Sequence, residues 1–313
     1  MSSRKYDNVL VFGPTGTVGG ITALEASKRG AKVWLAMRDP SKPIEEIPSD
    51  VEKSGKFTRV QADLTDPSSI IKVAQESGAK AAYVYLIHGA DIRPSLQALR
   101  DSGVEYVVFL SSYSVVGDMR EISQKDWIPW AHAQVEIALD EIGFPYVTAL
   151  RPAYFASNYY KNFLDRSVKP PKISYIYGDA ISDMITPEDI GAVGGAVLVE
   201  RPRDGKEVIF QCGPQLLTLE EGLNVIKRIT GRDDLDTKPT PKDEYIKNQV
   251  DKGFPPPLVN YLADNAEKQR NPETMYLSSM YEAAVAATKK YTGKDPMKFE
   301  EYIEKHKAEW QAL

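Results

Sequence analysis

The chain has few of the residues that build metal centres and disulfide frameworks. Its 313 residues include one cysteine, Cys212, and three histidines. A single cysteine cannot form an intrachain disulfide, and three histidines leave little room for a histidine-rich metal site. We therefore expect no disulfide and no bound metal, and any chemistry must come from other side chains or from an organic cofactor.

Excess positive charge and long apolar runs are also missing. The formal net charge is -5, so no basic face for direct nucleic-acid binding is expected. No run of about 18 apolar residues predicts a membrane span. The first residues, Met1 to Asp7, contain no apolar signal core, and we expect a cytoplasmic location.

The first half of the chain alternates short apolar runs with amphipathic segments. Six short runs bounded by turn residues are typical of buried parallel strands. The fold class predicted from this alternation is α/β, with a Rossmann-type doubly wound parallel sheet. The expected strands are residues 8–12, 32–37, 56–62, 82–87, 106–110 and 146–150, and the expected helices between them are 17–29, 67–77, 94–102 and 130–142.

The pattern loosens after Arg151. We predict an NAD(P)-binding Rossmann domain over residues 1–152 and a smaller mixed α/β substrate-binding lobe over 153–313, with part of 186–215 returning to the sheet. Gly194 and Gly195, inside a helix that begins after Thr186, predict close packing against a neighbour. Residues 298–313 predict one amphipathic helix docked on the body.

A glycine loop lies between the first expected strand and the first helix. Gly13, Gly16 and Gly19 form the pattern G-x-x-G-x-x-G. Glycine permits a sharp turn and close approach of a pyrophosphate, while the helix N-terminus offers free N–H groups. A tight turn without a ligand is the alternative. The expected cofactor contacts here are Gly13, Thr15, Gly16, Thr17, Val18 and Gly19.

Arg38 follows the second strand, where an acidic residue would otherwise hold the adenosine ribose hydroxyls. An arginine there can pair with a 2′-phosphate, which favours NADPH over NADH, although Asp39 lies next to it. A solvated loop arginine is the alternative. Asp63, followed by Leu64 at the expected cofactor edge, can accept a hydrogen bond from the adenine amino group or can cap a turn.

Several longer motifs extend over nearly the whole chain. They are GPTGTVGG at 13–20, MRDP at 37–40, QADLTD at 61–66, FLSSYS at 109–114, GFPYVTALRPAYFASNYY at 143–160, TPEDIGAV at 186–193 and GKDPMKFEEYIEKHKAEW at 293–310. Together they resemble the NmrA-like branch of the atypical short-chain dehydrogenases. The resemblance implies either an NADPH-dependent reductase of plant phenylpropanoids or fungal secondary metabolites, or a regulator that holds a dinucleotide without turnover.

The resemblance also locates a gap in the catalytic pattern. Short-chain dehydrogenases use a Tyr-x-x-x-Lys pair, in which tyrosine donates a proton and lysine holds the nicotinamide ribose. By comparison with the family, these two positions fall on Ile128 and His132. His132 can hydrogen-bond the ribose or act as an acid near neutrality. A core histidine bound to a backbone carbonyl is the alternative.

Further candidates follow the carboxyl ends of the expected strands, where ligands bind in open α/β sheets. Turn formation is the alternative for the serines, and packing between the lobes is the alternative for the aromatic residues. Ser112 joins His132 as a catalytic candidate, and His88, Ser111, His132 and Tyr154 are expected at the cofactor. The substrate candidates are His88, Tyr113, Tyr154, Phe155, Asn158 and Tyr159.

Three functions remain in view. The first is an NADPH-dependent reductase of a small metabolite, with a C=N or conjugated C=C bond preferred because the tyrosine acid is missing. The second is a catalytically silent NADP(H) sensor that acts through a protein partner. The third is a non-redox enzyme that uses His132 as acid or base. The aromatic residues after the sixth strand favour the reductase, because they predict a pocket for a small molecule.

Overall fold

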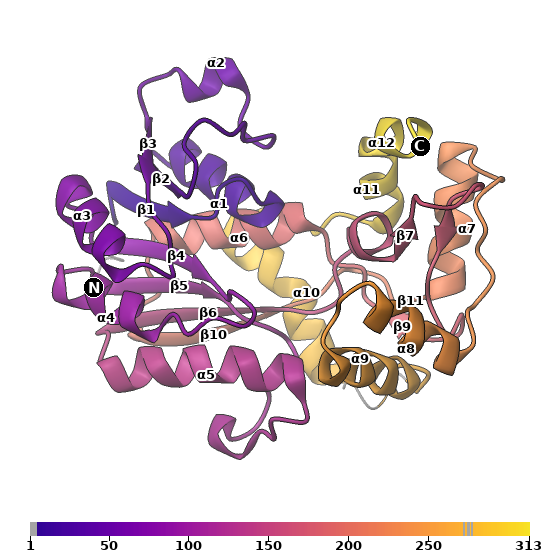
Figure 1. The fold of residues 1–313 in the computed structure, drawn as a ribbon. Helices are drawn as coiled ribbons and strands as arrows, with labels where there is room; N and C mark the ends of the chain where they lie inside the picture. The colour runs from indigo at the N-terminus through magenta and orange to yellow at the C-terminus, as the bar shows by residue number, and fades with distance from the viewer. Residues whose placement is uncertain (1–4, 272, 274–275, 277) are drawn as a thin grey trace.

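The chain folds into a layered α/β part and a more helical C-terminal lobe, which lie side by side (Figure 1). The computed structural model describes residues 5–271, 273, 276 and 278–313, so Met1 to Arg4 of the expected leaderless start lie outside it. Within these ranges, no helix combines the length and the apolar composition that a membrane span requires.

A seven-stranded sheet forms the centre of the first part. Its order is β10-β6-β5-β4-β1-β2-β3, and every neighbouring pair is parallel. The predicted doubly wound sheet is therefore confirmed, with its strand order reversing between β1 and β4, where such sheets bind ligands. The strands are β1 (Asn8–Phe12), β2 (Lys32–Met37), β3 (Phe57–Gln61), β4 (Ala81–Tyr85), β5 (Tyr106–Leu110), β6 (Tyr146–Pro152) and β10 (Lys206–Gln211).

Helices cover both faces of this sheet. One face packs against α1 (Thr17–Lys28), α6 (Pro187–Val199) and α10 (Ser278–Thr292). The other face packs against α3 (Pro67–Ser77), α4 (Arg93–Asp101) and α5 (Trp127–Ile142). A short helix, α2 (Ser49–Glu52), lies between β2 and β3. Because α6, β10 and α10 come from the second half of the chain, the layered part is assembled from both halves.

The contact between α1 and α6 depends on glycine. A Cβ atom on Gly195 would lie 2.6 Å from the Glu25 Cβ and 2.7 Å from the carbonyl oxygen of Thr22. A Cβ on Gly194 would lie 2.9 Å from the Thr22 hydroxyl oxygen. The close packing predicted from the glycine pair is confirmed, and it holds α6 directly against the helix that follows the glycine loop.

The C-terminal lobe has its own apolar core around Tyr159, Phe299 and Trp310. The predicted single tail helix is wrong, because the chain leaves helical geometry at His306, whose ring lies 2.9 Å from Glu188 and 2.6 Å from Glu309. The remaining elements are η1 (Met119–Glu121), η2 (Tyr159–Phe163), β7 (Leu164–Asp165), β8 (Lys172–Ile173), β9 (Ile181–Ser182), β11 (Leu217–Thr218), α7 (Leu219–Thr230), α8 (Lys242–Asp251), α9 (Pro256–Lys268), α11 (Phe299–Lys305) and α12 (Lys307–Gln311).

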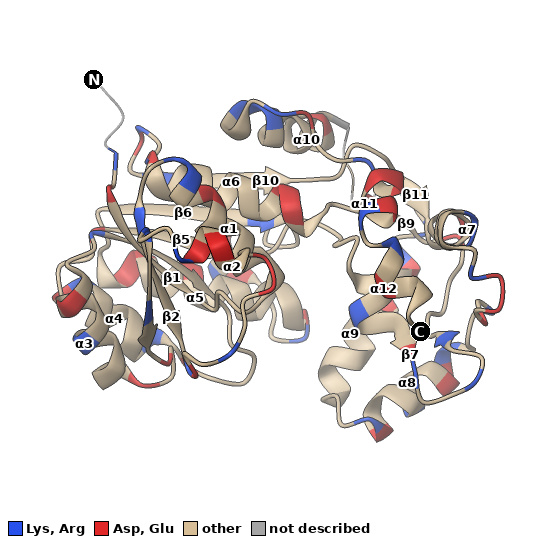
Figure 2. Ribbon diagram, turned by 90° about the horizontal axis from the view of Figure 1, so that it is seen from above, with Lys and Arg blue, Asp and Glu red and all other residues tan. Residues whose placement is uncertain are grey.

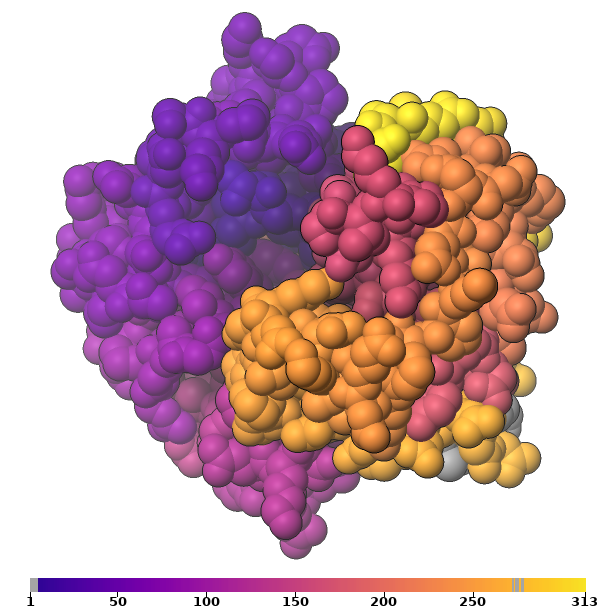
Figure 3. All heavy atoms as spheres, turned by 45° about the vertical axis from the view of Figure 1, so that its right-hand side comes forward, coloured from indigo at the N-terminus to yellow at the C-terminus, as the bar shows by residue number. Residues whose placement is uncertain are grey.

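Acidic and basic residues are interspersed over both parts of the ribbon, as Figure 2 shows. Figure 3 shows a hollow between the indigo-to-purple N-terminal part and the rose and orange segments of the C-terminal lobe. The carboxyl ends of the parallel strands open toward this lobe (Figure 1), so the hollow is where a ligand of this sheet would be enclosed.

Candidate functional site

The glycine loop turns the chain from β1 into α1. Gly13 has φ 67°, and a Cβ there would lie 2.5 Å from a ring carbon of Tyr85. A Cβ on Gly19 would lie 2.3 Å from the carbonyl oxygen of Gly13. Helix α1 has Gly16 as its N-cap, with no side-chain cap and no acidic residue in its first turn. Its first N–H groups therefore remain available for an anion.

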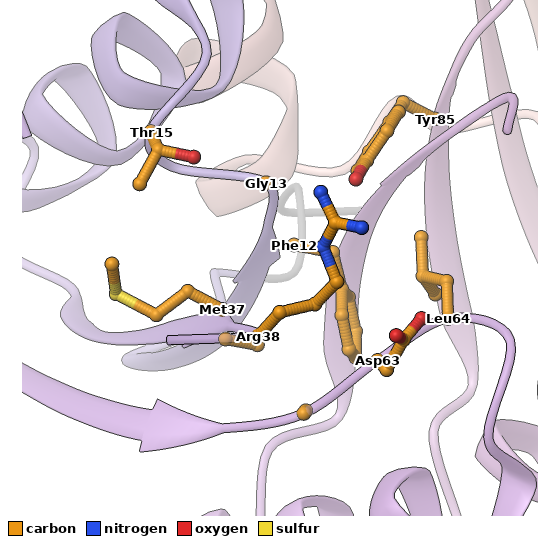
Figure 4. Close-up of a pocket in the computed structure, with 10 residues that line it drawn as sticks. Phe12, Gly13, Thr15, Met37, Arg38, Asp63, Leu64 and Tyr85 are labelled. Carbon is orange, nitrogen blue, oxygen red and sulfur yellow. The ribbon is translucent and has the colours of Figure 1, made fainter. Parts of the chain in front are cut away.

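A recess opens beside this loop (Figure 4). It lies at the carboxyl ends of β1, β2, β3 and β4, at the reversal of strand order. The structure brings five predicted cofactor residues together here, while Thr17 and Val18 lie on the adjoining first turn of α1. The residues that line the recess are Phe12, Gly13, Thr15, Ala36, Met37, Arg38, Ala62, Asp63, Leu64 and Tyr85.

Arg38 extends across the recess toward Tyr85 (Figure 4). Its side chain is exposed and makes no hydrogen bond or ion pair with any residue in the described ranges. The neighbouring carboxylate is already engaged, since Asp39 Oδ1 accepts hydrogen bonds from the Ser41 hydroxyl at 2.6 Å and from the Ser41 N–H at 3.0 Å. These bonds lower the pKa of Asp39. Asp39 is thus held in its own loop, while the guanidinium of Arg38 stays free at the recess.

Asp63 makes the turn-capping contacts that were the alternative to a cofactor role. Its Oδ1 accepts from the Thr65 N–H at 2.9 Å and from the Thr65 hydroxyl at 2.8 Å. Its Oδ2 has no hydrogen bond within the described chain. Because the two oxygens of a carboxylate accept independently, the capping role leaves one oxygen for a ligand in the recess.

Tyr85 is a lining residue that the sequence reasoning missed. The fourth strand was expected to run to residue 87, but β4 ends at Tyr85. The ring of Tyr85 therefore lies at the carboxyl end of this strand, next to the recess. Burial raises the pKa of Tyr85, which keeps the phenol neutral and able to donate a hydrogen bond. Tyr85 could have been identified from the sequence, because it ends a strand that lies next to the reversal of strand order.

The two histidines proposed as acids lie close together. The rings of His88 and His132 are 6.3 Å apart, and Phe109 lies 6.2 Å from His132. The Nδ1 of His132 is 2.8 Å from the carbonyl oxygen of Ile128. Burial lowers the pKa of His132 to about 4, and it also lowers the pKa of His88. Both rings are therefore neutral at pH 7.

Ser111 belongs to a buried ionic network with Glu136 and Arg151. Its hydroxyl donates to Glu136 Oε1 at 2.5 Å. Arg151 binds the same carboxylate through Nε at 3.0 Å and Nη2 at 2.6 Å, and its Nη1 donates to the carbonyl oxygen of Val115 at 2.6 Å. Ser111 is thus engaged in the core, which argues against the expected cofactor contact. The sequence reasoning did not identify Glu136, although its position one helical turn after His132 places both residues on the same face of the helix.

Ser112 lies at the same edge but faces a different partner. Its Oγ is 2.8 Å from the Oγ of Ser114, and both side chains are only partly buried. Tyr261 on α9 also hydrogen-bonds Ser114, and burial raises the pKa of Tyr261. The serine pair therefore connects the end of β5 to α9 of the C-terminal lobe. Sequence reasoning did not identify Tyr261, which lies about 150 residues away along the chain in an ordinary helical pattern.

The aromatic substrate candidates separate into two groups. Tyr159 is 1% exposed in the lobe core, and its hydroxyl donates to the carbonyl oxygen of Leu219 at 3.0 Å. Tyr113 is 3% exposed and packs against Phe210 and Tyr276. Burial leaves neither ring a surface for substrate, so both expectations are corrected to packing roles.

The other three candidates remain partly accessible after β6. Tyr154, Phe155 and Asn158 keep intermediate exposure. Phe155 also packs against the sheet core, and Asn158 Oδ1 accepts from the Asn162 side-chain amide at 2.8 Å. Tyr154 faces Phe163 at 6.2 Å between ring centres. These three residues therefore keep some surface that a ligand could contact.

A buried carboxyl group fixes this segment. Asp183 accepts from the backbone N–H of Tyr154 and of Gly213 at 2.8 Å each, and from the Tyr276 hydroxyl at 2.9 Å. Burial raises its pKa to about 6, against the opposing effect of these hydrogen bonds. Asp183 therefore ties the segment after β6 to the residues that follow β10.

Comparison with known proteins gives one family match and three similar proteins. A model of the NmrA-like family matches residues 5–303. A nitrogen metabolite regulation-like protein of Gibberella fujikuroi is 35% identical, over 97% of this chain and 98% of its own. Festuclavine dehydrogenase of Aspergillus fumigatus is 25% identical, over 81% of this chain and 80% of its own. The NADPH complex of an Escherichia coli quinone oxidoreductase superposes with TM-score 0.68 at 17% identity, covering 95% and 99% of the two chains.

Proposed function

Because this chain belongs to the NmrA-like family, we propose that it is an NADPH-dependent oxidoreductase that reduces a small organic molecule. The observation that carries the proposal is the recess of Figure 4, where the glycine loop, the uncapped N-terminus of α1 and the free cation Arg38 meet. The names of two similar proteins, a dehydrogenase and a quinone oxidoreductase, support the same activity.

The charges around the recess support NADPH in preference to NADH. NADPH differs by a phosphate on the adenosine ribose, and recognition of that phosphate needs a cation where NADH-binding sheets place a carboxylate. Arg38 supplies the cation, and its planar guanidinium can pair with phosphate oxygens in a bidentate manner. Asp39, the carboxylate that could bind the ribose hydroxyls, is held by Ser41. Asp63 has one free oxygen for the adenine amino group.

The protonation states at the sheet edge support a particular class of reaction. NADPH supplies a hydride when bound. A ketone that receives hydride becomes an alkoxide and needs a proton, but His132 and His88 are neutral near pH 7 and the tyrosine position holds Ile128. An iminium carbon that receives hydride becomes a neutral amine without any proton. We therefore favour a C=N bond, or a conjugated C=C bond whose enolate takes its proton from water.

His132 has a defined role in this proposal. A carbonyl oxygen only accepts hydrogen bonds, so the contact with Ile128 places the ring proton on Nδ1. The Nε2 atom is then an acceptor at neutral pH. It is suited to receive a hydrogen bond from a ribose hydroxyl of the cofactor, in place of the lysine of related enzymes, and it cannot donate a proton to substrate.

A substrate panel followed by NADPH absorbance tests the proposal, with iminium, conjugated alkene and ketone compounds compared in wild type and His132→Ala. We expect turnover of iminium or enone compounds, and a rate that does not change with histidine ionisation between about pH 6 and 8, because the pKa of His132 lies near 4. The His132→Ala variant loses cofactor affinity and rate, while Gln134→Ala, exposed on the same helix, keeps both.

Two results would contradict this account. Turnover of ketones alone would contradict the preferred reaction, and full activity in His132→Ala would contradict the role assigned to His132.

The name of the Gibberella relative favours a second candidate, an NADP(H)-binding regulator that acts through a protein partner. Tight NADPH binding without turnover across the panel would support that candidate. Turnover without NADPH would instead indicate the non-redox chemistry. A substrate from secondary metabolism belongs to the first proposal.

A further inference from the structure

A lysine of the C-terminal lobe contacts the helix that follows the glycine loop. Lys161 lies on η2, just after the aromatic segment that follows β6. Its Nζ donates a hydrogen bond to the hydroxyl of Thr17, the first residue of α1. The two residues are 144 positions apart in the chain, so this contact joins the lobe to the glycine loop directly.

The position of this ammonium group is electrostatically unfavourable without a ligand. The N-terminus of a helix carries a partial positive charge, so anions are stabilised there and cations are not. Two other helices of the chain follow this rule. Helix α6 begins with Glu188 and Asp189 after a threonine cap, and α7 begins with Glu220 and Glu221. Helix α1 has neither an acid nor a side-chain cap, and it has Lys161 against its first turn.

No carboxylate within the described residues forms an ion pair with Lys161. Glu46 is the acidic group that it influences electrostatically, and burial together with Glu188 raises the pKa of Glu46. Lys305 and His306 act on Glu46 as well, and both are bonded to Glu188. The side chain of Lys161 is exposed, and its hydrogen bond is to a neutral hydroxyl. Within the described residues, the ammonium group of Lys161 and the first turn of α1 thus lie next to each other, and no carboxylate is hydrogen-bonded to either.

We propose that Lys161 is a cofactor-binding residue whose ammonium group contacts the pyrophosphate of the dinucleotide from the C-terminal lobe. This inference rests on the proposed NADPH function, and it adds a contact that the glycine loop alone cannot supply. The pyrophosphate would lie between the free N–H groups of α1 and Lys161, which satisfies both positive features. The cofactor would then bridge the two lobes, and its affinity would depend on both.

The pyrophosphate is common to NADPH and NADH, whereas the 2′-phosphate belongs to NADPH alone. The test therefore measures the dissociation constants of both dinucleotides by fluorescence titration, for wild type, Lys161→Met, Lys161→Arg and Arg38→Leu. The matched control is Lys238→Met, which removes another exposed lysine of the same lobe. Circular dichroism and thermal unfolding of each variant check that the fold is kept.

We expect Lys161→Met to weaken NADPH and NADH equally, by about tenfold, because it removes one charge-assisted hydrogen bond to a phosphate. The affinity of Lys161→Met for either dinucleotide should also depend less steeply on salt concentration than the affinity of wild type does. Lys161→Arg should retain most of the affinity, and Lys238→Met should match wild type. Arg38→Leu should weaken NADPH far more than NADH, which separates the two phosphate contacts.

Two outcomes overturn the inference while leaving the proposed function intact. In the first, wild type binds NADPH, and Lys161→Met binds NADPH and NADH as tightly as wild type does. In the second, Lys161→Met weakens NADPH alone, which would place Lys161 at the 2′-phosphate. Failure of wild type to bind either dinucleotide would instead overturn the proposed function, and the inference with it.

Discussion

The ion pair between Glu136 and Arg151 gives the sharpest stability prediction for this fold. It joins α5 to β6, and the side chains are 6% and 8% exposed. The change Glu136→Gln keeps the shape of the side chain and removes its charge. Arg151 then remains as a buried cation, with the carbonyl oxygen of Val115 and one neutral amide as its nearest polar partners.

The magnitude follows from this burial. Two bonds from Arg151 and one from Ser111 converge on the carboxylate, so its replacement weakens three charge-assisted hydrogen bonds at once. Loss of one partner from a buried ion pair costs about 3–5 kcal/mol, because the other charge stays desolvated. We expect a loss of about 3 kcal/mol in the free energy of unfolding. The double variant with Glu136→Met and Arg151→Met should lose less stability than the sum of the losses in the two single methionine variants.

Urea titration followed by circular dichroism measures these free energies. The control is Asp251→Asn, which breaks the exposed pair between Lys247 and Asp251 and should leave the free energy of unfolding nearly unchanged. A Glu136→Gln protein as stable as the control variant would refute the reasoning, since it would mean that solvent or another group compensates Arg151. Additive losses in the double variant would refute it as well.

Two further predictions concern the contact between helices α1 and α6 and the break in the tail. The Gly195→Ala change places a Cβ 2.7 Å from the backbone oxygen of Thr22, so we expect a loss of about 1–3 kcal/mol by urea titration, and a loss near zero would contradict the tight contact. The pKa of His306 is raised by its hydrogen bond to Glu188, so its stabilisation is present below about pH 6.5 and is lost as pH rises through the raised pKa. His306→Gln should therefore cost more stability at about pH 6 than at about pH 9, and an equal cost at both would count against a charged His306.

The layered fold was predictable because its signals are local. Each strand is a short apolar run, and the glycine loop joins strand to helix in a fixed order. The break at His306 was not predictable, because the amphipathic pattern continues through it and the contact that His306 makes there is with Glu188, which is distant in sequence. The joining of β10 to β6 was anticipated only in outline, and the packing of α10 on the same layers was not anticipated.

In the candidate site, too, the residues with local sequence signals were predictable and those positioned by distant contacts were not. Gly13, Thr15, Arg38, Asp63 and Leu64 were placed by motif and strand order, and they meet in one recess. Tyr113 and Tyr159 looked like substrate residues because aromatic side chains serve packing and binding equally well, and burial alone distinguishes the two roles. Tyr85 and Lys161 were missed because their positions depend on the end of β4 and on the approach of the second lobe.

The central claim is that this chain holds NADPH in the recess and recognises it through Arg38. Measurement of the NADPH and NADH dissociation constants, in wild type and in Arg38→Leu, tests it most directly. We predict that wild type prefers NADPH by at least about tenfold, since the guanidinium pairs with the 2′-phosphate, and that Arg38→Leu abolishes the preference. Equal binding of the two dinucleotides by wild type, or an unchanged preference in the variant, would contradict the account.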